Sequence, residues 1–169
     1  MPYNFAPATP DEPTVFGACR PGHRRAPPDD TVVDWLSFAD DRGIDRVCCL
    51  LDGAHLSHYD DLLGTYRDHF GADRVLHAPV TDFEPIDRDL FCDEVLPFLQ
   101  EADAAGERVL VHCSAGIGRT GHVLALWLVH ERGYGLEAAI GAVEAADATR
   151  APLEGGKRLA DLRDLRCAD

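Results

Sequence analysis

The stretch of this chain best suited to covalent chemistry runs from His112 to Gly121 and reads HCSAGIGRTG. It places Cys113 six residues before Arg119 and puts two glycines between them. Glycines permit tight backbone turns, so successive amide groups of such a loop can point at one anion. A thiolate at Cys113 is a nucleophile, and the planar guanidinium of Arg119 can grip two oxygens of a phosphate group. The pattern therefore predicts nucleophilic attack on a bound phosphate.

The elements on either side should position this loop. The apolar run 108–112 predicts a buried strand that ends at Cys113, and residues 118–132 predict a helix. Anions bind beyond the carboxyl ends of strands in open α/β sheets and at helix N-termini. The loop amides and the helix dipole favour the thiolate form of Cys113. We assign phosphate binding to Ser114, Ala115, Gly116, Ile117, Gly118 and Arg119.

The sequence His-Cys-x5-Arg-Thr resembles the signature of the protein tyrosine phosphatase superfamily over ten contiguous residues. The resemblance implies that Cys113 is the nucleophile and that Arg119 binds phosphate and stabilises the transition state. Thr120 is expected to donate a hydrogen bond to the sulfur and help it leave in the second step. His112 is expected to hold the loop from behind or to favour the thiolate. The chemistry requires no metal and no organic cofactor.

The same resemblance implies a general acid on a loop upstream of the cysteine. Its task is to protonate the leaving oxygen and then to activate water against the phosphocysteine. The stretch from His77 to Pro85 fits that loop, and Asp82 lies 31 residues before Cys113, a spacing similar to that of small dual-specificity phosphatases. Glu84 and Asp87 are rival candidates in the same stretch.

The order of these motifs along the chain separates the subfamilies. Low-molecular-weight phosphatases and arsenate reductases carry the cysteine motif near the N-terminus with the acid downstream, which is the reverse of this chain. Rhodanese-like phosphatases lack the acid loop, and 169 residues are too few for the larger tyrosine-specific domain. The chain therefore resembles a small atypical dual-specificity phosphatase.

The loop side chains bear on the substrate. Ser114, Ala115 and Ile117 are uncharged, whereas relatives that act on phosphoinositides often carry lysines there. A neutral loop favours a single phosphate, so we expect a protein phosphatase that acts on phosphotyrosine and also on phosphoserine or phosphothreonine. The alternatives are a phosphatase for an inositol or sugar phosphate, and a phosphate-binding module without turnover. Modules of the last kind usually lack the cysteine, arginine or acid, and this chain has all three.

The charge balance bears on the possible partners of the chain. Sixteen basic and thirty acidic residues give a net charge of −14, which disfavours binding to nucleic acid and to anionic membranes. Lys157 is the single lysine and 21 of the acids are aspartate, a composition similar to that of proteins from salt-loving cytoplasms. The N-terminus lacks the pattern of a secretory signal, so we expect a cytoplasmic monomer whose partner is its phosphorylated substrate.

The six cysteines form no CxxC pair and no cluster with zinc-like spacing. We therefore expect buried free thiols rather than a disulfide framework. Cys48 and Cys49 lie on a strand that could neighbour Cys113, so a disulfide formed there under oxidation is the alternative. Arg20 lies in a loop that resembles the one bordering the pocket in related enzymes, where it would contact substrate or simply be exposed.

The chain predicts an α/β fold: a single domain with a central, mostly parallel sheet of about 4–5 strands flanked by helices. We expect a flexible arm over residues 1–13 and one catalytic domain over 14–169. The predicted strands are 14–18, 44–51, 74–78 and 108–112. The predicted helices are 29–43, 58–70, 87–105 with a kink at Pro97, 118–132, 136–146 and 154–166.

Overall fold

The computed structural model describes residues 2–167 and confirms the α/β fold, with a five-stranded sheet in the order β1-β2-β5-β3-β4. The strands are β1 (Ala6–Pro7), β2 (Val15–Ala18), β3 (Arg46–Cys49), β4 (Val75–His77) and β5 (Val109–His112). β1 is antiparallel to β2, and the other neighbours pair in parallel. In this register Cys49 and Ala18 flank His112, so the carboxyl ends of three strands meet where β5 delivers Cys113.

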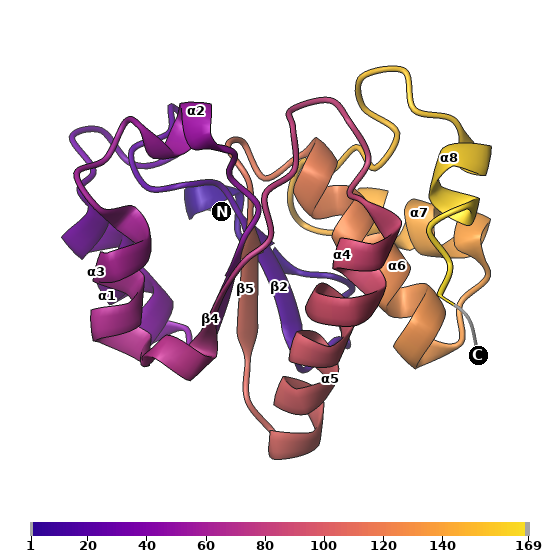
Figure 1. Ribbon diagram of the computed structural model, residues 1–169, viewed down its shortest axis with the longest axis horizontal. Helices are drawn as coiled ribbons and strands as arrows, with labels where there is room; N and C mark the ends of the chain where they lie inside the picture. The colour runs from indigo at the N-terminus through magenta and orange to yellow at the C-terminus, as the bar shows by residue number, and fades with distance from the viewer. Residues whose placement is uncertain (1, 168–169) are drawn as a thin grey trace.

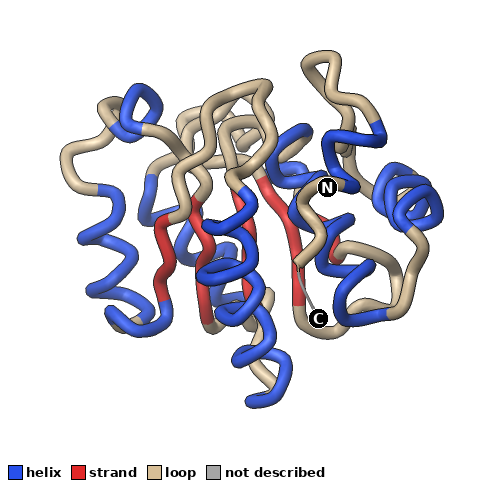
Figure 2. Tube along the Cα trace, turned by 45° about the vertical axis from the view of Figure 1, so that its right-hand side comes forward, coloured by secondary structure: helices blue, strands red, loops and turns tan. Residues whose placement is uncertain are grey.

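Helices cover both faces of the sheet (Figures 1 and 2). On one face lie α1 (Val32–Asp41) and α3 (Leu62–Phe70), with the short α2 (Gly53–Leu56) above them in Figure 1. On the other face lie α4 (Arg88–Leu90), α5 (Leu96–Ala105), α6 (Gly118–Arg132), α7 (Leu136–Glu144) and α8 (Leu159–Arg163). Short 3-10 turns occur at Pro2–Asn4 and Ala72–Arg74.

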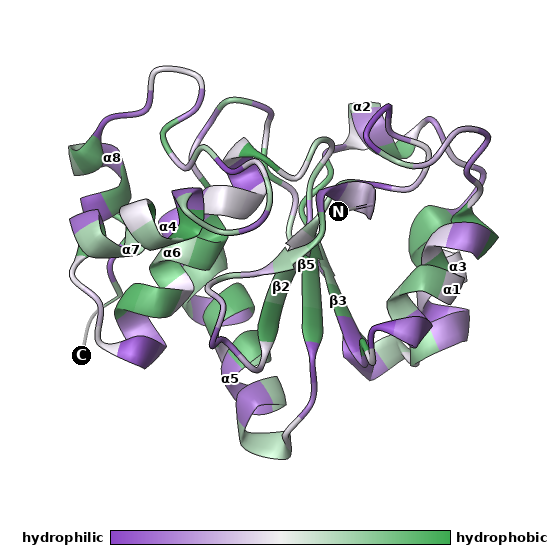
Figure 3. Cartoon of the chain, turned by 180° about the vertical axis from the view of Figure 1, so that it is seen from behind, coloured by the Kyte–Doolittle hydropathy of each residue, from purple (hydrophilic) through white to green (hydrophobic). Residues whose placement is uncertain are grey.

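Alternate residues of each central strand enter different cores. Val109 and Val111 pack with α5 and α6, whereas Leu110 between them packs with Trp35 of α1 and the residues around it. Seen from behind, β2, β3 and β5 are largely green in Figure 3 because parallel strands covered on both faces carry continuous apolar runs. The sheet is thereby fixed from both sides, and its carboxyl edge forms a rigid base for the loops.

The N-terminal segment differs from the prediction of a flexible arm. Residues 2–8 pack against the sheet, with Tyr3, Phe5, Ala6 and Ala8 at most 4% exposed, and β1 adds an antiparallel edge strand. The Phe5 ring stacks on Phe16 of β2 with centroids 5.5 Å apart. The first thirteen residues contain four prolines, and a proline-rich composition predicts a loop. The buried apolar side chains of this segment were therefore not recognised from the sequence.

Cys92 and Cys167 form a disulfide, so the expectation of free thiols is wrong for this pair. The two residues are 75 positions apart in the chain, and no local pattern links them. They meet because the C-terminal segment packs against the helical turn that precedes α5 and contains Cys92. Among the described residues, Cys19, Cys48, Cys49 and Cys113 remain free and buried.

Two helical predictions change in detail. The stretch 87–105 is interrupted, because a π-helical turn (Phe91–Val95) joins α4 to α5 and Pro97 occupies the first turn of α5. The last helix is restricted to α8, and residues 152–156 before it form turns. Within residues 2–167, no helix is long and apolar enough to cross a membrane.

Candidate active site

The phosphate loop, residues 113–119, connects β5 to α6 as the sequence predicts. The side chain of Cys113 lies at the end of β5 and is 2% exposed. The amide of Gly116 donates a hydrogen bond to the Cys113 sulfur at 3.3 Å. Gly116 has a φ of 76°, and a Cβ at this position would lie 2.5 Å from the carbonyl oxygen of Ala18. Only glycine therefore allows the loop to turn its amide towards the sulfur.

Two polar side chains behind the phosphate loop were missed by sequence reasoning. Arg150 is 5% exposed and donates from Nη1 to the Gly116 carbonyl at 2.6 Å. Asn4 donates from Nδ2 to the carbonyls of Ala115 at 3.2 Å and Thr149 at 2.9 Å. Both residues thus donate to backbone carbonyl groups of the phosphate loop. No motif marks either one, because each reaches the loop through the fold.

Burial lowers the pKa of Arg150 to about 10, so the guanidinium stays charged at neutral pH. Its Nε and Nη2 atoms are buried without a hydrogen-bond partner among the described residues. The charge lies within electrostatic range of Cys113, and that interaction raises the pKa of Arg150 against the effect of burial. Arg150 therefore adds positive potential beneath the thiol as well as a structural hydrogen bond.

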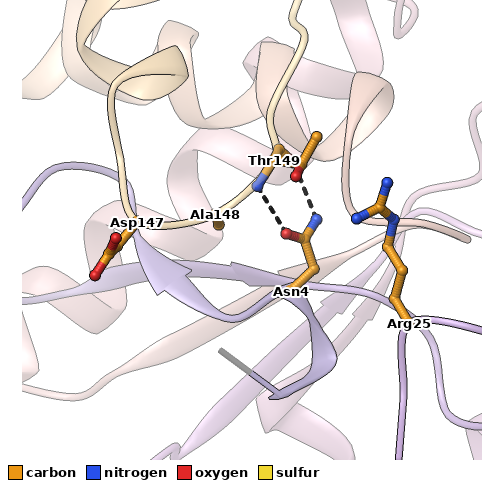
Figure 4. A pocket seen from close by; sticks show the side chains of 5 residues that line it. All are labelled: Asn4, Arg25, Asp147, Ala148 and Thr149. Atoms are coloured by element: carbon orange, nitrogen blue, oxygen red, sulfur yellow. Dashed lines mark hydrogen bonds between the residues drawn. The ribbon is translucent and has the colours of Figure 1, made fainter.

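Asn4 also lines a cavity of about 470 Å³ together with Arg25, Asp147, Ala148 and Thr149 (Figure 4). The Asn4 amide lies against Thr149, accepting a hydrogen bond from its backbone N–H at 2.8 Å and donating to its carbonyl. The cavity contains neither Cys113 nor Arg119. It therefore lies beside the phosphate loop rather than at the reacting group.

His112 supports the loop as an uncharged ring. It is fully buried, and burial lowers its pKa to about 4. Nδ1 lies 3.0 Å from the Cys113 carbonyl and must donate to it, which leaves Nε2 to accept from the Tyr66 hydroxyl at 2.9 Å. Burial also raises the pKa of Tyr66, so its proton is retained. The Trp35 ring packs edge-on against the imidazole.

Arg20 borders the phosphate loop, and its contact with substrate stays a prediction. Its Nε donates to the Ser114 hydroxyl at 3.1 Å, and its backbone amide donates to the Ser114 carbonyl at 2.9 Å. Its Nη1 donates to the Tyr59 hydroxyl, which in turn donates to the Pro21 carbonyl. Arg20 therefore braces the rim of the loop, and Tyr59 is a further rim residue that no motif marked.

Arg119 joins the phosphate loop to the acid loop, residues 79–85. Its side chain is 2% exposed, and Nη1 donates to the Val80 carbonyl at 2.9 Å. Nη2 lies 3.5 Å from the carboxylate of Asp82, whose side chain is 42% exposed. The structure thus brings the predicted acid and the predicted phosphate-binding arginine together from segments 37 positions apart.

The rival acids lie elsewhere. Asp87 caps α4, where its carboxylate accepts a hydrogen bond from the Leu90 amide at 3.0 Å. Glu84 is exposed, and its backbone amide donates to the Thr81 carbonyl within the turn. Among the described residues, Asp82 is the acid that pairs with Arg119.

Thr120 is fully buried in the first turn of α6, but its hydroxyl makes no hydrogen bond within the described part of the chain. The expected hydrogen bond to the Cys113 sulfur is therefore absent from this structure. The role of Thr120 in the departure of the sulfur therefore stays a prediction.

Burial favours the protonated form of the other free thiols near the loop. Burial raises the pKa of Cys19 to about 12 and that of Cys49 to about 12. Cys48 is fully buried, and its pKa is raised for the same reason. Between residues 2 and 167, no group of three or more His, Cys, Asp or Glu side chains is arranged to hold a metal ion.

Comparison with known proteins defines the class of this site. The family described as dual specificity phosphatase, catalytic domain, matches residues 51–154. This range contains the acid loop and the whole phosphate loop. The chain belongs to the dual specificity phosphatase family, and its site is that of a cysteine-based phosphatase.

Individual relatives are similar to this chain over parts of their length. The dual specificity protein phosphatase OPG106 of vaccinia virus is 36% identical over 55 residues, 32% of each protein. Mpk3 of Drosophila melanogaster, a dual specificity protein phosphatase, is 36% identical over 83 residues, which are 49% of this chain and 20% of Mpk3. The matches thus span about a third or less of these curated relatives.

Similarity to solved structures extends over nearly the whole chain. The structure of Tk-PTP in its active form is 25% identical, has a TM-score of 0.68, and is matched over 90% of both chains. Similarity to this phosphatase therefore extends beyond residues 51–154.

Proposed function

We propose that this protein hydrolyses phosphate monoesters through a phosphocysteine intermediate. The observation that carries the proposal is the 3.5 Å contact between Asp82 and Arg119, beside a loop whose Gly116 amide points at the Cys113 sulfur. The predicted nucleophile, the predicted phosphate-binding arginine and the predicted general acid thus lie near one another, although they come from two separate segments of the chain. That arrangement supports turnover rather than phosphate binding alone.

In the first step the Cys113 sulfur attacks phosphorus, so an S–P bond forms as the P–O bond to the alcohol breaks. Asp82 donates its proton to the departing oxygen. In the second step water attacks phosphorus, Asp82 accepts a proton from it, and the S–P bond breaks. Arg119 and the loop amides stabilise the charge on the equatorial oxygens in both steps, and Thr120 assists departure of the sulfur.

We propose phosphotyrosine in proteins as the principal substrate, with phosphoserine and phosphothreonine as further substrates. The uncharged loop positions Ser114, Ala115 and Ile117 suit a single phosphate group. Phe83, which follows the general acid, is 55% exposed and offers an apolar surface to an aromatic ring. The net charge of −14 disfavours substrates held on nucleic acid or anionic membranes.

The first experiment measures hydrolysis of p-nitrophenyl phosphate in high salt with EDTA, comparing the wild type with Cys113→Ser. We expect activity in the wild type and a loss of at least about 10³-fold in the variant, because serine is a far weaker nucleophile than a thiolate. A trapped phosphoenzyme after acid quench would identify the intermediate. A folded wild type that binds vanadate and turns over nothing would contradict the proposal and favour a binding module.

A substrate panel tests the second part. Phosphotyrosine peptides are expected to give a higher kcat/KM than phosphoserine or phosphothreonine peptides, inositol phosphates and sugar phosphates. If the soluble phosphosugars or inositol phosphates react far faster than the peptides, the protein is a metabolite phosphatase and the substrate assignment is wrong.

A further inference from the structure

A turn in the C-terminal third of the chain lies between the two loops of the active site. We call residues 151–157 the clasp segment. On one side it contacts the start of α6: the Ala151 amide donates to the Ile117 carbonyl at 3.1 Å, and Pro152 packs against Gly121. A Cβ placed on Gly118 would lie only 3.1 Å from the Cβ of Glu154. The clasp segment is therefore fitted tightly onto the phosphate loop.

On its other side the clasp segment contacts the acid loop through Gly155. Gly155 approaches Phe83 so closely that a Cβ on Gly155 would lie 2.7 Å from the Phe83 Cβ and 2.9 Å from its carbonyl oxygen. Phe83 itself has a φ of 65°, a left-handed conformation that is costly for an aromatic residue. Phe83 directly follows Asp82, so contact with Gly155 constrains the backbone that carries the general acid.

The single lysine of the protein braces this turn. Lys157 is 7% exposed, and its ammonium donates to the Glu154 carbonyl at 2.6 Å. Burial lowers its pKa, while the nearby charges of Glu154 and Asp82 act in the opposite direction. This hydrogen bond links the two ends of the Glu154–Lys157 turn and holds Gly155 against the acid loop.

We propose that the clasp segment positions Asp82 over the phosphate loop and that Gly155 is the positioning residue through which it acts. The inference rests on the proposed function, because it needs Asp82 to be the general acid. The segment touches the phosphate loop and the acid loop at once, so it sets the separation between the nucleophile and the proton donor. Since Gly155 has a φ of 80°, any larger residue adds both strain and a clash with Phe83.

Gly156 provides a matched control for the test. It has a φ of 81°, so substitution costs the same backbone strain, but a Cβ there would meet nothing within 4 Å. Gly155→Ala and Gly156→Ala therefore differ only in the contact with Phe83. Any difference between them reports on that contact rather than on the strain of a left-handed alanine.

The measurement is kcat on two aryl phosphates, p-nitrophenyl phosphate with a good leaving group and phenyl phosphate with a poor one. Protonation by Asp82 matters most for the poor leaving group. We expect Gly155→Ala to lower kcat on phenyl phosphate about tenfold more than on p-nitrophenyl phosphate, and to flatten the pH profile as Asp82→Asn does. Gly156→Ala should keep the wild-type ratio of kcat on the two substrates. Inhibition by vanadate should be unchanged in both glycine variants.

Equal substrate ratios in Gly155→Ala and Gly156→Ala would overturn the inference while leaving the proposed function intact. A wild type inactive on both substrates would instead defeat the proposed function. If Gly155→Ala fails to fold in a thermal unfolding scan, Lys157→Met replaces it as the deciding variant. Lys157→Met removes the hydrogen bond across the same turn and introduces no clash with Phe83. A ratio of kcat on the two substrates equal to that of the wild type would then overturn the inference.

Discussion

The phosphate loop is built from buried groups, whereas the acid loop carries its reactive group at the surface. Cys113 and Arg119 are each 2% exposed, while Asp82 is 42% exposed through its side chain and Phe83 is 55% exposed. The phosphate loop is held from behind by two buried polar side chains, Arg150 and Asn4. The acid loop is held by Arg119, by a hydrogen bond from the Val80 amide to the Leu50 carbonyl, and by its contact with Gly155.

This difference follows from what each loop has to do. A nucleophile and its anion site need fixed geometry, because misplacement by about 1 Å can reduce the rate by about 10²-fold. A general acid serves two steps and must admit water between them, so a loop with few buried contacts suits it. The structure thus combines a rigid binding loop with a loop held by a small number of specific contacts.

Arg119→Lys should have the largest effect, because Arg119 is the side chain that joins the two loops. Lysine keeps the charge but loses the planar, two-pronged grip on phosphate and the hydrogen bond to the Val80 carbonyl. We expect kcat/KM on p-nitrophenyl phosphate to fall about 10³-fold, an effect of the size seen when a transition-state donor is removed. A loss below tenfold, in a protein with wild-type thermal stability, would show that the charge alone suffices.

Asp82→Asn should have the next largest effect and should separate the acid loop from the phosphate loop. The variant keeps the size of the side chain but cannot donate a proton, so kcat on phenyl phosphate should fall about 10²-fold. Vanadate inhibition should remain near that of the wild type. Glu84→Gln is the control, because Glu84 is exposed on the same loop. An equal loss in Glu84→Gln would shift the acid role to that residue.

Asn4→Ala tests the buried support of the phosphate loop. The substitution leaves the carbonyls of Ala115, Gly116 and Thr149 without this donor, and we expect the free energy of unfolding to fall by about 2 kcal/mol. Chemical denaturation measures the change, with the exposed Asp11→Ala as control. KM for aryl phosphates should rise while the leaving-group ratio stays unchanged. A changed ratio with an unchanged KM would argue that Asn4 acts on the acid loop instead.

The last expected effect concerns stability alone: His112 and His122 should make the free energy of unfolding depend on pH. Burial lowers the pKa of His112 to about 4 and that of His122 to about 3, so below pH 6.5 the unfolded chain binds more protons than the folded one. The free energy of unfolding should therefore decrease as the pH falls from about 6.5 to 5, by up to about 1.4 kcal/mol per pH unit for each histidine.

Denaturation curves at pH 5, 6 and 7 measure this slope. His122→Asn should reduce it, because one of the two histidines no longer titrates. The buried amide of Ile86 donates to His122, and asparagine retains an acceptor for it. A slope identical in the variant and the wild type would contradict the assignment of the pH dependence to His122.

Much of the fold and of the chemistry was predictable because its signals are local. The ten residues from His112 to Gly121 contain the end of a strand, a glycine turn and the start of a helix. Each of these features depends on residues that are close together in the sequence. Asp82 was predicted to be the general acid from its spacing to Cys113, which resembles that of a known family. In the structure its carboxylate lies 3.5 Å from Arg119. The parallel sheet was predicted by short apolar runs that alternate with helical periodicity.

The remaining features depend on contacts between distant positions, which only the tertiary structure decided. Asn4 and Arg150 reach the phosphate loop from the two ends of the chain, and Cys92 meets Cys167 across 75 positions. Proline-rich residues 2–8 became an ordered edge of the sheet because Tyr3 and Phe5 found an apolar surface to bury. The sequence by itself determined which atoms can react, since that follows from residue type and local turn geometry. Packing determined which side chains hold those atoms in place, since burial and hydrogen-bond partners are properties of the folded chain.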